Sequence, residues 1–158
     1  MDELQLKLCD IQGRLFELSG EKRLPSAAFI RTFMTSETAK DLDSRYNRAQ
    51  WMGEEYLLEE VLDASNGKLE KAGEVYQRDV LYWTGYLYRY WHYYTGESSS
   101  KILKQAPPLT MKRNYLMFHT MDPSLAVCKL KEIGEQKKCR YRVGGGNELR
   151  VAETPKRQ

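Results

Sequence analysis

The chain has few of the residues from which metal sites and disulfide frameworks are built. Its 158 residues include three cysteines and two histidines. Cys9, Cys128 and Cys139 are odd in number and form no Cys-x-x-Cys pair, so neither a disulfide framework nor a zinc site is expected. The sequence shows no paired-carboxylate alternative, and we expect neither a metal nor another cofactor. This use of cysteine fits a reducing compartment, and we expect the cytoplasm.

Long apolar runs are also missing. The start, MDELQLKLCD, is acidic and lacks the apolar stretch preceded by positive charge that is typical of a signal peptide. The most aromatic segment contains Asp79, Arg89 and His92, and it is too short and too polar to span a membrane. We therefore expect no membrane partner. Apolar content of 41% and charged content of 30% fit a soluble globular protein.

Neither sign of charge dominates the body of the chain. Residues 1–70 carry nine basic and fourteen acidic side chains, and residues 71–136 carry nine basic and six acidic ones. Residues 137–158 carry seven basic and two acidic side chains, so the formal net charge of +3 depends on this end. A body that is near neutral argues against a broad electrostatic surface for DNA.

Strand-like alternation is absent from residues 1–136, where helical periodicity is found instead. Apolar residues recur every three or four positions over residues 3–19 and again over about 47–64. Helix starts are expected at three possible cap residues and at one Asp-Pro pair, namely Ser26, Ser36, Thr110 and Asp122-Pro123. The last helix is expected to end at about Lys137.

These signals predict an all-α fold. We expect residues 1–138 to form a single-domain bundle of six to eight helices around a central aromatic helix at about 79–95. Residues 139–158 contain three consecutive glycines and several basic residues, and we expect them to form a flexible basic tail. The alternative for this tail is a basic arm or small hairpin that orders on a partner.

The expected central helix is unusually rich in aromatic residues. The thirteen residues from Tyr82 to Tyr94 hold six of the eleven tyrosines and two of the three tryptophans. A helix that is apolar on all sides is expected to be buried, yet each buried tyrosine hydroxyl needs a partner. One stripe at helical spacing is the predicted partner-binding surface: Tyr82, Tyr86, Arg89 and Tyr93.

Arg89 decides the role of this stripe, because a buried guanidinium without a counter-ion costs several kcal/mol. Either it lines a cleft that accepts an anion or a peptide, or it pairs with an acid of the bundle. The candidate acids are Glu54, Glu55, Glu59 and Asp79. A third use of the stripe, stacking of single-stranded nucleic acid, is disfavoured because the body lacks the expected positive groove.

A second candidate site lies near the end of a predicted helix. Arg113 and Asn114 are followed by His119, six positions after the arginine, and then by the Asp122 restart. This pattern resembles the motif of the HEPN family of all-helical ribonucleases, although Met121 stands where many members carry a tyrosine. The resemblance implies metal-independent RNA cleavage in a dimer cleft, with His119 as acid/base and Arg113 stabilising the charged phosphate. The alternative is a surface arginine and a histidine that favourably closes a helix C-terminus.

A broader resemblance covers residues 27–135. The segments that carry it are FMTSETAKDLD, QWMGEEYLLEE, YWTGYLYRYW, TGESS and FHTMDPSLAV. They resemble a family of short, poorly characterised bacterial helical proteins associated with toxin–antitoxin-type loci, some next to ADP-ribosyltransferase-like genes. This resemblance implies a context and assigns no roles to residues.

Three functions follow, in order of preference. The first is a non-enzymatic bacterial cytoplasmic module that binds a partner protein, as an antitoxin or accessory component does, through the aromatic and arginine stripe. The second is a HEPN-like endoribonuclease, whose partner is RNA and whose active form is a homodimer. The third, a helix-turn-helix DNA binder over residues 26–45, conflicts with the acidic side chains of that segment.

Overall fold

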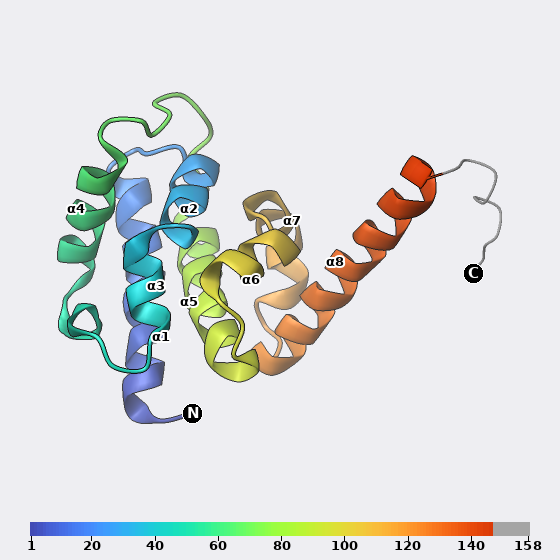
Figure 1. The fold of residues 1–158 in the computed structure, drawn as a ribbon, viewed down its shortest axis with the longest axis horizontal. Coiled ribbons are helices and arrows are strands. Elements are labelled where there is room, and N and C mark those ends of the chain that lie inside the picture. Colours follow the sequence, from blue (N-terminus) through green and yellow to red (C-terminus); the bar gives the residue numbers. More distant parts are fainter. Residues whose placement is uncertain (147–158) are drawn as a thin grey trace.

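The computed structural model describes residues 1–146, the last seven of them as backbone only. Within this range the chain forms a single all-helical domain with no strand, as Figure 1 shows, which confirms the predicted fold class. It has eight α-helices and one short 3-10 helix, η1. In chain order these are α1 (Glu3–Glu21), α2 (Ser26–Met34), α3 (Glu37–Asp43), η1 (Arg48–Trp51), α4 (Glu54–Ser65), α5 (Arg78–Thr95), α6 (Ser99–Gln105), α7 (Pro108–Phe118) and α8 (Pro123–Gly146).

Local signals place most helix ends where the sequence predicts them. Ser36 caps α3 by accepting a hydrogen bond from the backbone N–H of Ala39, and Ser98 caps α6 in the same way. Asn66 and Gly96 adopt left-handed backbone conformations at the ends of α4 and α5. Both residue types tolerate this conformation, which ends a helix cleanly.

Two predicted caps make other contacts instead. Ser26 is the first residue of α2 rather than its cap, and its hydroxyl accepts a hydrogen bond from the backbone N–H of Tyr76. Thr110 lies buried inside α7, where its hydroxyl accepts a hydrogen bond from the Lys137 ammonium. The cap prediction at Thr110 is wrong because Pro108 already starts the helix.

Two predicted helix spans also differ from the structure. Residues 47–64 divide into η1 and α4, because Met52 and Gly53 are extended. The last helix does not end at about Lys137, since α8 continues to Gly146 and the expected domain boundary at 138 falls inside it. In Figure 1 this part of α8 runs out beyond the other helices. The rest of the predicted flexible tail, residues 147–158, lies outside the described residues.

The centre of the fold is the pair α1 and α5, which pack along each other, while α6, α7 and α8 contact α5 as well. The two backbones approach closely at Gly85. A Cβ atom there would lie 2.4 Å from the carbonyl oxygen of Gln12, which is closer than packed atoms tolerate. The side-chain amide of Gln12 donates to the carbonyl oxygen of Gly85 at 3.1 Å. A side chain at Gly85 would therefore force the two helices apart.

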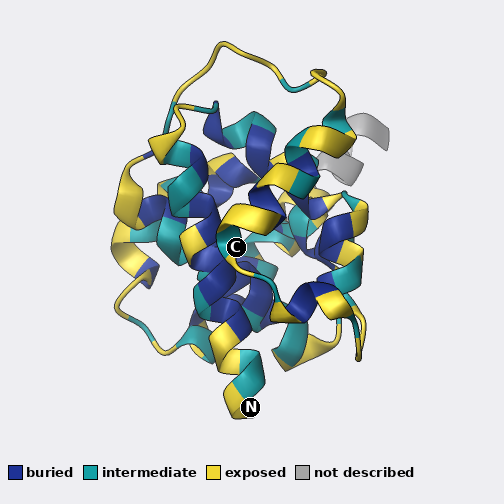
Figure 2. Ribbon diagram, turned by 90° about the vertical axis from the view of Figure 1, so that its left-hand side faces the viewer, coloured by how far each residue is buried: buried dark blue, intermediate teal, exposed yellow. Residues whose placement is uncertain are grey.

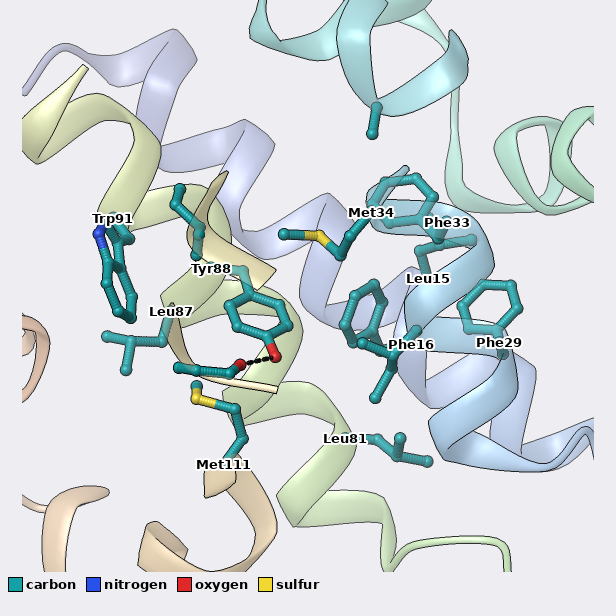
Figure 3. Packing of buried hydrophobic residues seen from close by; sticks show 14 of the residues in the cluster. Leu15, Phe16, Phe29, Phe33, Met34, Leu81, Leu87, Tyr88, Trp91 and Met111 are labelled. Atoms are coloured by element: carbon teal, nitrogen blue, oxygen red, sulfur yellow. Dashed lines mark hydrogen bonds between the residues drawn. The ribbon is translucent and has the colours of Figure 1, made fainter. Parts of the chain in front are cut away.

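Aromatic side chains fill the space between α1, α2 and α5. Phe16 makes edge-on contacts with Phe29, Phe33 and Tyr88, which Figure 3 shows from close by. The buried Tyr88 hydroxyl donates to the carbonyl oxygen of Ala106 at 2.5 Å, which satisfies its polar atom and joins α5 to the end of α6. In Figure 2 the buried residues lie on the inward sides of the helices. The aromatic helix α5 is central, as its composition predicts.

The base of α8 is held to the body by a carboxylate in the turn between α5 and α6. Glu97 accepts hydrogen bonds from the Trp91 indole and the Lys131 ammonium, each at 2.8 Å. Burial alone would raise the pKa of the Glu97 carboxyl, but the hydrogen bonds from Lys131 and Trp91 lower that pKa to about 2. Lys131 also donates to the side chain of Gln105 at 2.9 Å, so α5, α6 and α8 share one polar contact.

Candidate functional site

The structure places Arg89 inside the protein, where 1% of the residue is exposed. Its Nη1 lies 2.7 Å from Oδ1 of Asp43, its Nε donates to the side-chain oxygen of Gln12 at 2.8 Å, and its Nη2 donates to the Ser99 hydroxyl at 3.2 Å. Ser99 in turn donates to Asp43 through both its hydroxyl and its backbone N–H. All three nitrogens of the guanidinium are thus bound internally, which agrees with the alternative that Arg89 pairs with an acid of the bundle; that Arg89 contacts a partner stays a prediction.

The counter-ion of Arg89 is Asp43, which is not among the acids predicted from the sequence. Asp43 is the last residue of α3 and lies 46 positions from Arg89 in the chain. Among the described residues, Arg89 makes no ion pair with any of the four predicted acids, Glu54, Glu55, Glu59 and Asp79. The contact depends on how α3 packs beside α5, and no periodicity along the sequence reports that packing.

Tyr93 and His92 lie on the Arg89 side of α5. The guanidinium of Arg89 is 5.9 Å from the centroid of the Tyr93 ring, and burial raises the pKa of the Tyr93 hydroxyl. The two ring nitrogens of His92 lie 2.6 Å and 3.1 Å from the carbonyl oxygens of Glu97 and Asp43. His92 therefore links three segments of the fold, which is a structural role.

Tyr82 and Tyr86 lie elsewhere, in a groove of about 650 Å³ between α1, α5 and the α7–α8 turn, called the tyrosine groove below. The Tyr82 hydroxyl donates to Oδ1 of Asp10 at 2.5 Å, and Asp10 also pairs with Arg14 at 2.7 Å. Burial and the Asp10 acceptor raise the pKa of the Tyr82 hydroxyl, which keeps it a proton donor. The predicted stripe thus lies in two different surroundings: Tyr82 and Tyr86 line the groove, whereas Arg89 and Tyr93 lie near Asp43.

Three stacked or edge-on rings form the other wall of the tyrosine groove. Trp83 meets Tyr115 edge-on at 5.7 Å between ring centroids, and Tyr115 stacks on His119 at 4.3 Å. The Nδ1 atom of His119 lies 2.8 Å from the carbonyl oxygen of Tyr115, so this nitrogen is a hydrogen-bond donor. Met121 and Pro123 complete the lining at the α7–α8 turn.

Acidic side chains outnumber basic ones around the tyrosine groove. Asp10, Glu17 and Asp79 line it, against the guanidinium of Arg14 and the imidazole of His119. Aromatic faces together with carboxylates attract a cationic group. The arrangement therefore suits a ligand that combines apolar surface with positive charge.

The residues of the HEPN-like motif are not brought together. Arg113 and His119 are both exposed, but only His119 lines the tyrosine groove. Six positions along a helix place two side chains about 120° apart around its axis. Asn114 donates to the carbonyl oxygen of Thr110 within α7. The groove thus receives an acid/base candidate without the predicted phosphate-binding cation, and the alternative of RNA cleavage stays untested.

Several residues of the groove were not predicted from the sequence. Asp10, Arg14 and Glu17 recur at helical spacing along α1, opposite its apolar face, and this pattern is also that of an ordinary solvated face. Tyr115 lies between Asn114 and His119, and no pattern in the sequence marks it as a site residue. Only the packing of α1 and α7 against α5 turns these side chains into one surface.

No family model, curated protein or solved structure matches the chain. In the part of the chain that the structure describes, no helix is long and apolar enough to cross a membrane. Nor do three or more His, Cys, Asp or Glu side chains gather there into a group that could hold a metal ion. A proposal about function therefore depends on the surfaces of the fold.

Proposed function

We propose that the protein is a non-enzymatic binding module that holds a segment of a partner protein in the tyrosine groove. The observation that carries this proposal is the convergence of four aromatic side chains from α5 and α7 on one groove, namely Tyr82, Trp83, Tyr86 and Tyr115. Tyrosine and tryptophan supply much of the binding energy at the centres of protein interfaces, since they bury a large area with few rotatable bonds.

The charge of the groove indicates the chemistry of the partner segment. An arginine of the partner is favoured, because a guanidinium stacks on aromatic rings and also forms paired hydrogen bonds with a carboxylate. Asp79 lines the groove and is available for such a contact. Glu17 also lines it and now pairs with the exposed Arg78 at 2.8 Å; on binding, the arginine of the partner replaces Arg78 in this ion pair. We therefore expect a segment with at least one arginine or lysine beside apolar residues.

The resemblance of residues 27–135 to bacterial helical proteins of toxin–antitoxin-type loci supports a protein partner encoded in such a locus. On this proposal the chain is a bacterial cytoplasmic protein, either antitoxin-like or an accessory component. Its role is to bind, and the side chains of the groove act through packing and charge.

Replacement of Tyr86 by alanine tests the proposal. Tyr86 lines the groove and, among the described residues, its hydroxyl makes no hydrogen bond, so its loss should leave the fold intact. The partner is first isolated with the tagged wild-type protein and then titrated by calorimetry. We expect Tyr86→Ala to weaken binding by about 2 kcal/mol, or roughly 30-fold, the size of an interface hot spot.

The matched control is Tyr56→Ala, because Tyr56 is a 45% exposed tyrosine on α4 outside the groove. This variant should bind with wild-type affinity. Asp79→Asn should weaken binding as well, since it removes a carboxylate from the groove. If the partner binds the wild type and the Tyr86 and Asp79 variants equally, the groove is not the interface and the proposal is wrong.

A further inference from the structure

A second groove, of about 1020 Å³, lies between α6 and α8 and is called the lysine groove below. Half of its lining residues are lysines: Lys101, Lys104, Lys131, Lys137 and Lys138. Glu97 and Glu135 are the acids among them, and no aromatic or large aliphatic side chain takes part. The net charge of residues 1–136 is close to neutral and therefore does not indicate this local cluster of positive charge.

Most of the positive charge in the lysine groove is not neutralised by the protein. Glu97 is already bound by Lys131, with Lys101 at 3.6 Å from its second oxygen. Lys137 donates to the neutral hydroxyl of Thr110 at 3.1 Å. Over the described side chains, no carboxylate forms an ion pair with Lys104, Lys137 or Lys138, and all three lysines are exposed.

The fold fixes the crossing of the two helices that carry these cations. At Gly134, a Cβ atom would lie 2.7 Å from the carbonyl oxygen of Gln105, so α8 approaches the end of α6 as closely as a glycine allows. The hydrogen bonds from Lys131 to Glu97 and Gln105 fix the same crossing. Lys104 of α6 and Lys138 of α8 consequently line one groove although they are far apart in the sequence.

We propose that the lysine groove binds the phosphate backbone of nucleic acid without sequence preference. Lysine contacts a phosphate as a point charge and carries no information about the base. The lining favours nucleic acid over an acidic protein, because the centres of protein interfaces are apolar and depleted in lysine, whereas nucleic-acid interfaces are polar and positively charged. The proposal does not depend on the tyrosine groove.

Fluorescence anisotropy with the full chain tests the proposal, using a fluorescein-labelled single-stranded RNA and a duplex DNA, each of about 20 nucleotides or base pairs and arbitrary sequence. We expect binding to at least one probe at about 50 mM salt, with log K falling linearly as log salt concentration rises. Three unpaired lysines predict slopes of about −2 for the single strand and about −3 for the duplex. The comparison of probes shows which form supplies the phosphates.

The double variant Lys104→Glu/Lys138→Glu should weaken binding by at least about tenfold and reduce the salt slope by about 1.4 for a single strand. The control is Lys68→Glu/Lys71→Glu, which changes the net charge equally at two exposed lysines in the segment between α4 and α5. The control should keep most of the affinity. Circular dichroism checks that both variants are folded, and Lys138→Gln is the substitute if charge reversal lowers the melting temperature.

Four results would overturn the proposal. The first is that neither probe binds at about 50 mM salt. The second is that the affinity does not fall as salt rises, because phosphate contacts require such a fall. Alternatively, both double variants lose affinity equally, which would assign the effect to net charge rather than to the groove. Finally, polyglutamate binds the groove while neither nucleic acid does, which would indicate an acidic protein as its ligand.

Discussion

Removal of the counter-ion of Arg89 should be one of the most damaging single substitutions in this protein. In Asp43→Ala the guanidinium, 1% exposed, keeps its bonds to Gln12 and Ser99 but loses its only anion within the described residues. Breaking a buried ion pair by removal of one partner costs about 3–5 kcal/mol. Since domains of this size are stable by only about 5–15 kcal/mol, this is a large part of the total.

The two sides of the pair are not equivalent. Asp43 is 13% exposed, and the hydroxyl and backbone N–H of Ser99 would still donate to it if Arg89 were removed. Arg89→Met leaves no buried cation and fills much of the same space. We therefore expect the double variant Asp43→Ala/Arg89→Met to regain at least about half of the stability lost in Asp43→Ala.

Urea unfolding at neutral pH, followed by far-UV circular dichroism, measures these differences in the free energy of unfolding. Asp63→Ala, at an exposed aspartate of α4, is the control and should change stability by less than about 0.5 kcal/mol. A loss below about 1 kcal/mol in Asp43→Ala would refute the argument, because it would mean that Arg89 reaches water or another acid. A double variant as unstable as Asp43→Ala would show that packing, and not charge, determines the cost.

Three further predictions concern the helix contacts and the motif at the end of α7. The pKa of Glu97, about 2 in the fold against an ordinary 4.5, implies stability that is present above pH 4.5 and lost as the pH falls toward 2. Allowing for solvent screening, this loss is about 1–2 kcal/mol, and urea unfolding at several pH values should show it in the wild type but not in Glu97→Gln. Gly85→Ala should lower stability by about 1–3 kcal/mol because its Cβ would meet the backbone of α1. Gly53→Ala has its nearest contact at 3.9 Å and should cost less, about 0.5–1 kcal/mol, the difference between glycine and alanine at the N-cap of α4. Single-stranded RNA should stay uncut on a denaturing gel, because Arg113 does not line the groove with His119; cleavage in chelator that is lost in His119→Ala would instead support the ribonuclease hypothesis.

Local sequence determined the helical fold and most helix ends. Periodicity predicts α1 and most of α4, and residues such as Ser36 and Gly96 mark helix ends through their own side chains or backbone freedom. The aromatic content of residues 82–94 likewise predicts a central helix. These predictions hold because helix formation and capping depend on residues within a few positions of one another.

Tertiary packing alone decided where the polar groups of α5 lie. Arg89 and Tyr86 are three positions apart on the same predicted stripe, yet Arg89 meets Asp43 inside the protein while Tyr86 lines a groove. Periodicity shows which residues share a side of a helix, but not which neighbouring helix covers that side. A stripe of one helix is wide enough to lie against two neighbours, and only the positions of α1, α3 and α7 determine which part is buried.

The same reason explains the lysine groove. Lys104 and Lys138 lie 34 positions apart, in segments whose charges are unremarkable when each is taken alone. They line one groove because Gly134 allows α8 to pack closely on α6. Composition gives only the net charge of a segment, whereas a ligand responds to the positions of the charges in space. Those positions are determined by how the helices pack.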